Sequence, residues 1–372
     1  MSVSVNRKAF LSALNEMAVV APKDSTAPIL QCVWLRASGG LMRARATDLE
    51  VHVERAIDVT GDAEFCAAVD LRRLIPVVKN ATGNDITLAA DGHALVIQDS
   101  GHSMRIEGRD PGDFPSKPDI KMEVGDRVDI RRFYGAVDKV SFAQGKEEYR
   151  RYLHGIYLHC IKDGILRVVA CDGHRLAYYD LDRAKNGKIA GDGQIFNSLA
   201  IKVLFRAAKK ESGFAKVVVM PSYVAVVSER LEIFSKAMGH NYPDYERVIP
   251  NYSKGDTKLL QIESGKLAGI VKKAASLSNK KDKAVCFKRK NGELVIMGEK
   301  EEAGQIIVDV PEEDYEWQGG DLTVAFRARY IEDVASHIGG RMKMVFLDHG
   351  SPAFVYDEDD KNFMSLLMPT RF

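Results

Sequence analysis

The chain has 372 residues, 45% of them hydrophobic and 28% charged, and 53 Lys and Arg residues against 52 Asp and Glu residues leave a net charge of +1. This composition is typical of a globular protein of two or three domains, and it excludes a uniformly basic nucleic-acid-binding protein. No apolar run reaches the roughly 18 residues of a membrane span. The five scattered cysteines form no CxxC pair, which argues against disulfides and zinc and favours a reducing cytoplasm.

The first third of the chain predicts a helix, a β-hairpin and a second helix. Asn6 is a good N-cap, and apolar residues follow it at helical spacing. Strand patterns at residues 41–46 and 51–54 are separated by a polar turn, as in a hairpin. A second helix is expected after Asp70, and we expect Pro76 to kink or shorten it. The inward-facing residues predicted for the two helices are Phe10, Leu11, Leu14, Met17, Leu71 and Leu74.

The middle third repeats this order. A helix is expected after Asp129, a hairpin is expected from strands at residues 165–170 and 176–179, and a second helix is expected near Ser198. The Asp-Gly pair at residues 172–173 is typical of a tight turn, because Gly tolerates a positive φ angle. The predicted inward-facing residues are Phe133, Val137, Val140, Ile201 and Leu204.

The last third follows the same order again. Ser264 is the expected cap of its first helix, strands are expected at residues 294–297 and 305–308, and a second helix is expected near Arg327. The predicted inward-facing residues are Leu267, Ile270, Val271, Ala274, Ile331 and Val334. A threefold repeat of this length predicts an α+β protein with three similar domains, which we divide at residues 1–122, 123–252 and 253–372.

The six predicted helices share basic faces away from their apolar sides. A solvated helix often carries Lys and Arg, so a single such face indicates little. Recurrence in every helix favours a common positive surface, and it accords with acidic runs at residues 312–316 and 357–360, outside the helices. The basic residues on these faces are Arg7, Lys8, Arg72, Arg73, Lys79, Arg131, Arg132, Lys139, Lys202, Arg206, Lys209, Lys210, Lys266, Lys272, Lys273, Arg327 and Arg329.

The sequence contains none of the common signatures of nucleotide hydrolysis, dinucleotide binding, zinc proteolysis or serine hydrolysis. One enzymatic alternative is a phosphodiesterase that uses Asp172 and His174 as an acid–base pair, with His154, His159 and Asp163 nearby in the sequence. The competing interpretation is non-catalytic: Asp172 and Gly173 form a tight turn, and His174 and Arg175 bind a ligand.

Four stretches carry a resemblance to a known family: TDLE at residues 47–50, DGHRLA at 172–177, YPDYERVIP at 242–250 and MPTRF at 368–372. In order and spacing they resemble the bacterial DNA polymerase III beta subunit, the beta sliding clamp, over essentially the whole chain. The resemblance implies the DNA clamp fold, with two helices inside and antiparallel sheets outside each domain. It also implies that two chains close head to tail into a ring around duplex DNA.

A clamp of this kind is a non-catalytic processivity factor without cofactor or metal. The partners that the resemblance implies are duplex DNA, a replicative DNA polymerase, an ATP-driven clamp loader, other proteins with a clamp-binding motif, and a second copy of the chain, all in the cytoplasm. Sliding requires contacts to phosphates rather than to bases. The alternative among binding proteins is a nonspecific DNA-binding protein that does not close a ring.

The DNA-binding residues that we expect combine the basic helix faces with neighbouring positions, and Lys23 is the nearest equivalent of a loop Arg in the family. Where the family has a Pro-Arg-Lys cluster, this chain has Asn197, Ser198 and Leu199, which removes one expected contact. The full expected set is Lys23, Arg72, Arg73, Lys79, Arg131, Arg132, Tyr152, His174, Arg175, Lys202, Arg206, Lys266, Lys272 and Arg327.

Ring closure is expected to join the last strand of the first domain to the end of the first helix of the third domain. Three repeats cannot enclose a duplex, whereas six can, and a head-to-tail contact generates a closed ring if the rotation closes. Polar residues near Arg105 and Ser276 replace apolar ones of the family, so we expect a more polar interface. The apolar candidates for this contact are Met104, Ile106 and Leu277.

The last predicted site is an apolar cleft for a partner peptide between the second and third domains. The C-terminal sequence SLLMPTRF is too apolar to be left in water without a purpose, and Met suits a pocket that accepts several peptides. In the family this cleft takes a short motif of the kind Gln-Leu-x-Leu-Phe. The predicted cleft residues are Leu153, Gly173, Arg175, Leu176, Pro243, Arg247, Val248, Met368, Pro369, Thr370 and Arg371; Thr370 stands where the family often has Met.

Overall fold

The computed structural model describes residues 2–161, 164–182, 193–208, 210–249, 257–277, 283–300 and 304–372. Contacts group the chain into two compact units. Unit 1 comprises Met1–Gly135, Leu158–Leu166 and Asp182–His240; unit 2 comprises Ala136–Tyr157, Arg167–Leu181 and Asn241–Phe372. The threefold division at residues 122 and 252 stays a prediction, and its second boundary lies outside the described residues. No helix in the described parts is long and apolar enough to cross a membrane.

Unit 1 is built on a sheet whose strand pairs are all antiparallel. Its main path runs β8 (Ser103–Ile106), β7 (Ala94–Gln98), β6 (Asp85–Asp91), β1 (Val3–Asn6), β4 (Val51–Thr60), β16 (Leu231–Lys236), β15 (Tyr223–Val227), β14 (Phe214–Met220) and β9 (Asp126–Asp129). Off this path, β3 (Leu41–Thr47) pairs with β4, and β2 (Cys32–Ser38) lies between β3 and β5 (Phe65–Asp70).

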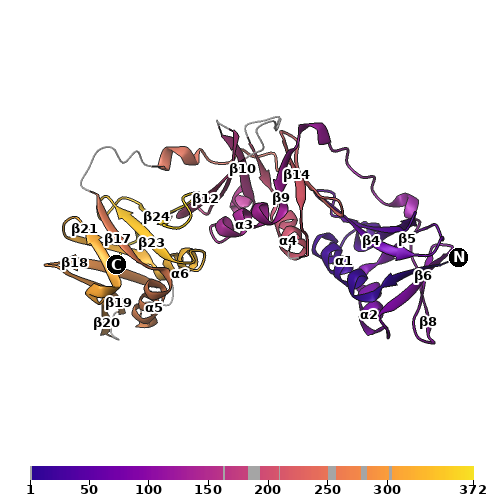
Figure 1. Cartoon of the computed structure of the whole chain (residues 1–372), viewed down its shortest axis with the longest axis horizontal. Helices are drawn as coiled ribbons and strands as arrows, with labels where there is room; N and C mark the ends of the chain where they lie inside the picture. Colours follow the sequence, from indigo (N-terminus) through magenta and orange to yellow (C-terminus); the bar gives the residue numbers. More distant parts are fainter. Residues whose placement is uncertain are drawn as a thin grey trace. The chain divides into compact units, whose positions relative to one another are not determined.

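The helices of unit 1 begin where the sequence predicts. In α1 (Arg7–Val20), the side chain of Asn6 accepts a hydrogen bond from the Ala9 N–H, and α2 (Leu71–Asn80) is capped in the same way by Asp70. In α4 (Ser198–Ala207) the cap is Asn197. Pro76 lies inside α2, but the helix continues to Asn80. The predicted inward-facing residues of these helices are buried except Leu11, which is half-buried; α1 and α2 lie side by side (Figure 1).

A buried ion network lies between α1, β4 and the segment after α4. The Arg55 guanidinium donates to the Glu16 carboxylate at 2.8 Å and also to Glu211, and all three residues are less than 10% exposed. Burial raises the pKa of Glu16, although the charge and hydrogen bond of Arg55 oppose that rise. Ionisation of Glu16 therefore costs more free energy in the folded state than in the unfolded state.

Unit 2 contains a second antiparallel sheet path and a separate four-stranded sheet. The path runs β12 (Arg175–Asp182), β25 (Phe363–Leu367), β24 (Ala353–Asp357), β23 (Arg341–Phe346), β17 (Lys258–Glu263) and β21 (Tyr315–Gln318). The smaller sheet has the order β20 (Gly304–Asp309), β19 (Glu293–Lys300), β18 (Ala284–Lys290) and β22 (Leu322–Arg327). In Figure 1, α5 (Ser264–Ala274) and α6 (Ala328–Ala335) lie beside each other.

Three further elements belong to both units or lie at their limits: α3 (Ile130–Ser141), β10 (Ile156–Ile161) and β11 (Ile165–Cys171). Asp129 accepts hydrogen bonds from the first N–H groups of α3, as the sequence predicts. All five cysteines are free.

The predicted cap of α5 is wrong. The helix begins at Ser264 itself, and its N-cap, Glu263, makes no side-chain capping bond. The Ser264 hydroxyl instead donates to the carbonyl of Ile338 at 2.8 Å, in a buried position. A contact across 74 residues therefore takes the side chain that local reasoning assigns to the helix end.

One turn recurs in both units with the same hydrogen bonds. Between β3 and β4, the Asp48 N–H donates to the Val51 carbonyl at 3.2 Å, and the Asp48 carboxylate accepts from the Val51 N–H at 2.7 Å. Between β11 and β12, Asp172 and Arg175 make the corresponding bonds at 3.2 and 3.0 Å. The predicted internal repeat thus extends to individual hydrogen bonds.

Candidate functional site

Three stretches that are far apart in the sequence converge in unit 2. Leu176 from β12, Tyr245 from the connector after β16 and Leu366 from β25 belong to one buried apolar cluster, against which Cys171 and Tyr242 also pack. The pairing of β12 with β25 places Leu176 opposite Leu366. The sequence assigns the turn, the connector and the C-terminal strand to one cleft. All three segments contribute to the same buried apolar cluster.

The C-terminal tail is held at two points rather than frayed. Leu366 and Leu367 end β25 and are buried, and the next N–H, that of Met368, donates to the His174 carbonyl at 2.9 Å. Two residues further on, the Thr370 N–H donates to the carbonyl of Ala325 in β22 at 2.8 Å. The side chain of Met368 remains 39% exposed, so the tail presents an apolar group to solvent from a fixed backbone.

The other predicted cleft residues divide by exposure. Leu153 and Leu176 are buried, whereas Val248 is 48% exposed and Pro243 is also exposed. Pro369 and Thr370 are half-buried; Arg371 and Arg247 are exposed, and Arg247 pairs with Asp244 at 2.7 Å. The exposed members are available to a ligand, while the buried leucines support them.

Arg175 lies inside the protein rather than on the rim. It is 5% exposed, and its guanidinium donates to Asp172 at 2.9 Å and to Asp333 of α6 at 2.6 Å. The same guanidinium lies 4.4 Å from the ring centroid of Tyr330 and 5.5 Å from that of Phe142. Because two carboxylates and two rings already surround its charge, Arg175 is a positioning residue that links the turn to α6.

Gly173 has a backbone conformation that favours glycine. Its φ angle is +89°, and a β-carbon there would lie 2.6 Å from a guanidinium nitrogen of Arg150. The Arg150 side chain comes from the 3-10 helix at Glu148–Leu153 and therefore lies over the turn. Arg150 was not among the residues predicted from the sequence.

Burial also sets the charge state around this turn. It raises the pKa of the Cys171 thiol and raises the pKa of the Tyr242 phenol well above its ordinary value. Both groups are therefore neutral near pH 7, and they contribute an apolar wall rather than a nucleophile or a charge.

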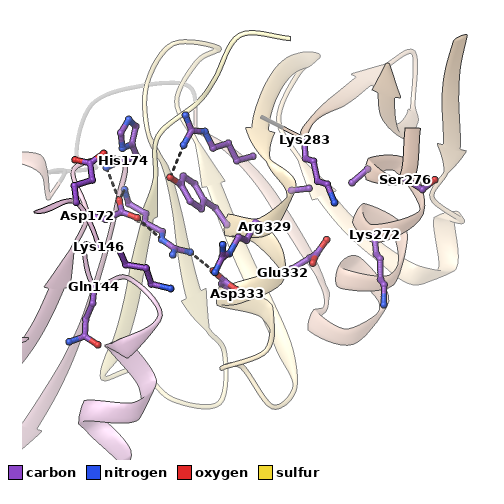
Figure 2. Close-up of a pocket in the computed structure, with 16 residues that line it drawn as sticks. Gln144, Lys146, Asp172, His174, Lys272, Ser276, Lys283, Arg329, Glu332 and Asp333 are labelled. Atoms are coloured by element: carbon purple, nitrogen blue, oxygen red, sulfur yellow. Dashed lines mark hydrogen bonds and ion pairs between the residues drawn. The ribbon is translucent and has the colours of Figure 1, made fainter. Parts of the chain in front are cut away.

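A hollow of about 880 Å³ opens beside the turn, between it and the helices α5 and α6. Figure 2 shows Asp172 and His174 at one end, Arg329 and Asp333 between, and Lys272 and Ser276 at the other end. Four predicted DNA-binding residues line it: His174, Arg175, Lys272 and Arg327. With Lys146, Lys283 and Arg329 the lining holds six Lys and Arg side chains against four carboxylates, which suits an anionic ligand.

Sequence reasoning missed Phe142, Tyr330 and Asp333 as partners of Arg175. Tyr330 and Asp333 are three residues apart on α6, so their spacing predicts a shared helix face. Nothing in the sequence indicates that this face meets a turn 158 residues earlier in the chain.

The remaining predicted DNA-binding residues are mostly on exposed helix faces. Lys23, Arg72, Arg73, Lys79, Arg131, Arg132, Lys202, Arg206, Lys266 and Lys272 are exposed, and Tyr152 and Arg327 are half-buried. Some already have a partner: Arg72 pairs with Asp70 at 3.1 Å, and Arg206 donates to the Asn15 carbonyl at 2.9 Å. Lys209, on a predicted basic face, lies outside the described residues.

The predicted interface residues occupy an open sheet edge in unit 1 and a helix end in unit 2. Met104 and Ile106 belong to β8, the terminal strand of its sheet; Ile106 is 7% exposed, so Met104 is the more available of the two. Leu277 ends the short helix Ala275–Leu277, which contacts β20, the terminal strand of the smaller sheet. Ile307 of β20 is 50% exposed.

The acid–base pair of the enzymatic alternative is not arranged for catalysis. The Asp172 carboxylate accepts from the backbone N–H groups of His174 and Arg175 and pairs with the Arg175 side chain. These hydrogen bonds give the Asp172 carboxylate a structural role in the turn. Asp163, which this alternative also names, lies outside the described residues.

Comparison with known proteins identifies the family in three consecutive segments. Residues 1–118 match the N-terminal domain of the DNA polymerase III beta subunit, residues 127–244 its central domain and residues 246–371 its C-terminal domain. The beta sliding clamp of Caulobacter vibrioides is 30% identical over 379 residues, and that of Pseudomonas aeruginosa 28% identical over 378 residues, with both chains covered completely in each case.

Solved structures agree with the sequence comparison. A Pseudomonas aeruginosa sliding clamp bound to griselimycin superposes with a TM-score of 0.92 at 26% identity, and a Caulobacter crescentus beta sliding clamp with 0.90 at 28% identity, again over the whole of both chains. The chain belongs to the DNA polymerase III beta subunit family, the beta sliding clamps. It has the three DNA-clamp domains of that family and is a non-catalytic processivity subunit of a DNA polymerase, with DNA and the polymerase as its partners.

Proposed function

We propose that two copies of this chain close into a ring around duplex DNA, and that the ring tethers the replicative polymerase through the C-terminal tail and the turn that follows Cys171. The observation that carries the DNA-binding part is the recurrence of exposed Lys and Arg on the helices of a chain whose net charge is only +1. Charge concentrated on helices binds phosphates without reading sequence, as sliding requires.

Ring closure rests on the two open sheet edges. β8 ends one sheet in unit 1, and β20 ends the smaller sheet in unit 2. An unpaired edge strand offers N–H and C=O groups to another chain, so β8 of one copy and β20 of the other are suited to continue a sheet. Leu277 lies against β20, and Met104 belongs to β8, so this pairing includes the contact proposed from the sequence.

The polymerase, the loader and other partners are proposed to bind the cleft formed by the exposed members of the site, chiefly Val248, Met368 and Arg371. The ordered tail supports this role, because a fixed backbone that exposes Met costs little further conformational entropy when a peptide binds. A short peptide in one apolar pocket should bind with about micromolar affinity, about 8 kcal/mol. An ATP-driven loader is a further proposed partner, since a closed ring needs an energy source to open.

The topological part of the proposal is tested by loading the clamp on DNA and comparing retention on circular and linear molecules. A ring slides off the ends of linear DNA but stays on a closed circle, so retention should be lost on linearisation and restored when the ends are blocked with bound protein. Equal retention on both forms would refute encirclement and favour the alternative of a nonspecific DNA-binding protein without ring closure.

The peptide part is tested by deleting residues 368–372 and titrating a Gln-Leu-Ser-Leu-Phe peptide by calorimetry. The deletion removes the exposed Met368 and the anchor at Thr370, so binding should be abolished while ring mass and DNA retention persist. Replacing only Phe372, which is 52% exposed at the chain end and was not assigned to the cleft, serves as the matched control. Unchanged affinity in the deletion variant would show that the cleft has been assigned to the wrong residues.

A further inference from the structure

A second basic hollow lies in unit 1, away from the helices. Along β2 and β3, the side chains of Leu35, Met42 and Ala44 are buried, on the side that packs against α1. The alternating side chains point to the opposite face, because successive residues of a strand alternate. There they line a hollow of about 530 Å³: Trp34, Arg36, Ser38, Leu41, Arg43 and Arg45, joined by Glu54 and Lys117.

This hollow is strongly positive. Its lining has four cations, Arg36, Arg43, Arg45 and Lys117, and only one carboxylate, Glu54. The Lys117 ammonium group pairs with Glu232, which does not line the hollow, whereas the three arginines belong to adjacent strands. None of the basic helix faces contributes to it, so the role proposed for DNA does not account for this charge.

Glu54 organises two of the arginines. It is 6% exposed; one carboxylate oxygen accepts from Arg43 at 2.8 Å, and the other accepts from Arg45 at 3.1 and 2.7 Å. Burial acts to raise the pKa of Glu54, but the hydrogen bonds and charge of Arg45, followed by Lys117 and Arg43, outweigh it and lower that pKa. The carboxylate thus stays ionised and holds two guanidinium groups in fixed orientations, with N–H groups left over for a ligand.

Arg36 has a different environment. It is exposed and lies directly opposite Arg43 in the pairing of β2 with β3. Its side chain has no hydrogen bond or ion pair within the part of the chain that the structure describes. Like charges directly opposite each other in a sheet destabilise it. Arg43 already pairs with Glu54, so Arg36 is the member of this pair whose charge an additional anion would stabilise.

We propose that this face of the sheet docks an acidic peptide segment of a partner protein. Aspartate and glutamate side chains match the planar forks of Arg36 and Arg43, which can bind a carboxylate through two parallel hydrogen bonds. The hollow has the volume of a pocket for a few side chains, and Leu41 and Trp34 contribute apolar side chains to its lining. The site shares no residue with the proposed cleft, DNA-binding or interface sets, so it stands independently of them.

A nucleic acid strand fits this face less well than a peptide. Proteins that bind single strands without sequence preference stack bases on exposed aromatic rings. The only ring in the hollow belongs to Trp34, and the Arg45 guanidinium lies over it, 4.4 Å from the centroid. That ring face is therefore occupied, and the arginine forks remain as the recognition groups.

The test uses the full-length protein and a short fluorescein-labelled peptide of alternating Glu and Gly, with a Gln-Gly peptide of equal length as the neutral probe. In fluorescence anisotropy the acidic peptide should bind and the neutral peptide should not. The double variant Arg36→Gln, Arg43→Gln should weaken binding at least tenfold. The single variant Arg36→Gln removes the member of the opposed pair that has no ion pair, so it should unfold at the same temperature as the wild type or at a slightly higher one, whereas a purely structural role of Arg36 predicts a lower melting temperature.

The matched control is Lys288→Gln, Lys290→Gln, which removes two exposed cations two residues apart on β18. It should leave peptide affinity unchanged. An equal loss of affinity in this control would show that only the net charge of the protein matters, and it would overturn the proposal. Absence of binding to the acidic peptide would also overturn it. So would tighter binding of a single-stranded oligonucleotide lost in the Arg36, Arg43 variant, or self-association lost in that variant by sedimentation, since each assigns the face to a different occupant.

Discussion

Replacing Arg175 with Met should destabilise unit 2 and disable the proposed peptide cleft. Arg175 is 5% exposed and makes charge-assisted hydrogen bonds to Asp172 and Asp333 at 2.9 and 2.6 Å. Met retains much of the buried volume but leaves two carboxylates without their cation. Breaking a buried ion pair by removing one partner costs about 3–5 kcal/mol.

The structure favours the lower end of that range. Asp172 keeps two backbone N–H partners, from His174 and from residue 175 itself, and Asp333 keeps a contact with Arg329 at 3.6 Å. The side chain of Asp333 is also 29% exposed, so water solvates it in part. We therefore expect a loss of about 3 kcal/mol in the free energy of unfolding.

The assay exploits the two tryptophans, Trp34 in unit 1 and Trp317 in β21 of unit 2. In a Trp34→Phe background, fluorescence during urea unfolding reports on unit 2 alone. The control is Arg329→Met, which removes an exposed guanidinium that also reaches Asp333; surface pairs of this kind contribute about 0–1 kcal/mol. If Arg175→Met and Arg329→Met shift the transition equally, the buried network does not stabilise unit 2 and the reasoning fails.

A second readout separates positioning from stability alone. The His174 carbonyl that follows Asp172 holds the tail through the Met368 N–H. Loosening the turn should therefore weaken Gln-Leu-Ser-Leu-Phe binding at least tenfold under conditions in which the variant is still folded. Arg175→Lys, which restores the charge but not the fork, should recover stability in part and affinity only slightly. Full recovery of affinity by Lys would contradict the geometric role of the guanidinium.

Three further predictions address other parts of the molecule. The combined variant Arg132→Ala, Lys202→Ala, Lys272→Ala should weaken DNA binding for all sequences and reduce the slope of log affinity against log salt by about 2.7 in an anisotropy titration; an unchanged slope would count against these contacts. Leu277→Asp should give a folded monomer by sedimentation, because it introduces an unpaired charge into the proposed interface, and a dimer of normal strength would remove Leu277 from it. Burial raises the pKa of Glu16 above its ordinary 4.5, so ionisation costs the folded state, and the wild type should lose stability relative to Glu16→Gln as pH rises from about 4.5 through that raised pKa; a difference independent of pH in urea titrations would refute this.

The sequence predicted the elements of this fold well because its signals are local. Asn6 and Asp70 cap helices through bonds that span two or three residues, and apolar spacing identifies the buried side of each helix. The predicted hairpins follow from alternating strands around short turns. The family segments and the repeated turn could be predicted for the same reason, because each motif is a contiguous stretch of the chain.

Prediction failed where the partner of a side chain is distant in sequence. Ser264 was assigned to a helix cap, but it bonds a carbonyl 74 residues away. Arg175 was predicted as a ligand-binding residue of the cleft, but its guanidinium bonds Asp333, 158 residues later, inside the protein. In both cases the residue type fits the local role, and only the packing of separate elements decides against it. The exposed residues Val248 and Met368 agree better with expectation because nothing in the described chain covers them.

The repeated turn accepts different residues at the same backbone position. Both copies need a positive φ at the residue after the aspartate: Leu49 has +76° and Gly173 has +89°. A leucine in this conformation costs roughly 1–2 kcal/mol, yet the fold accepts it in unit 1, where its side chain is 53% exposed. In unit 2 a β-carbon would displace the Arg150 guanidinium that lies over the turn. The glycine therefore leaves room for the Arg150 side chain above the turn as well as meeting the backbone requirement, whereas the exposed Leu49 side chain in unit 1 meets only the backbone requirement.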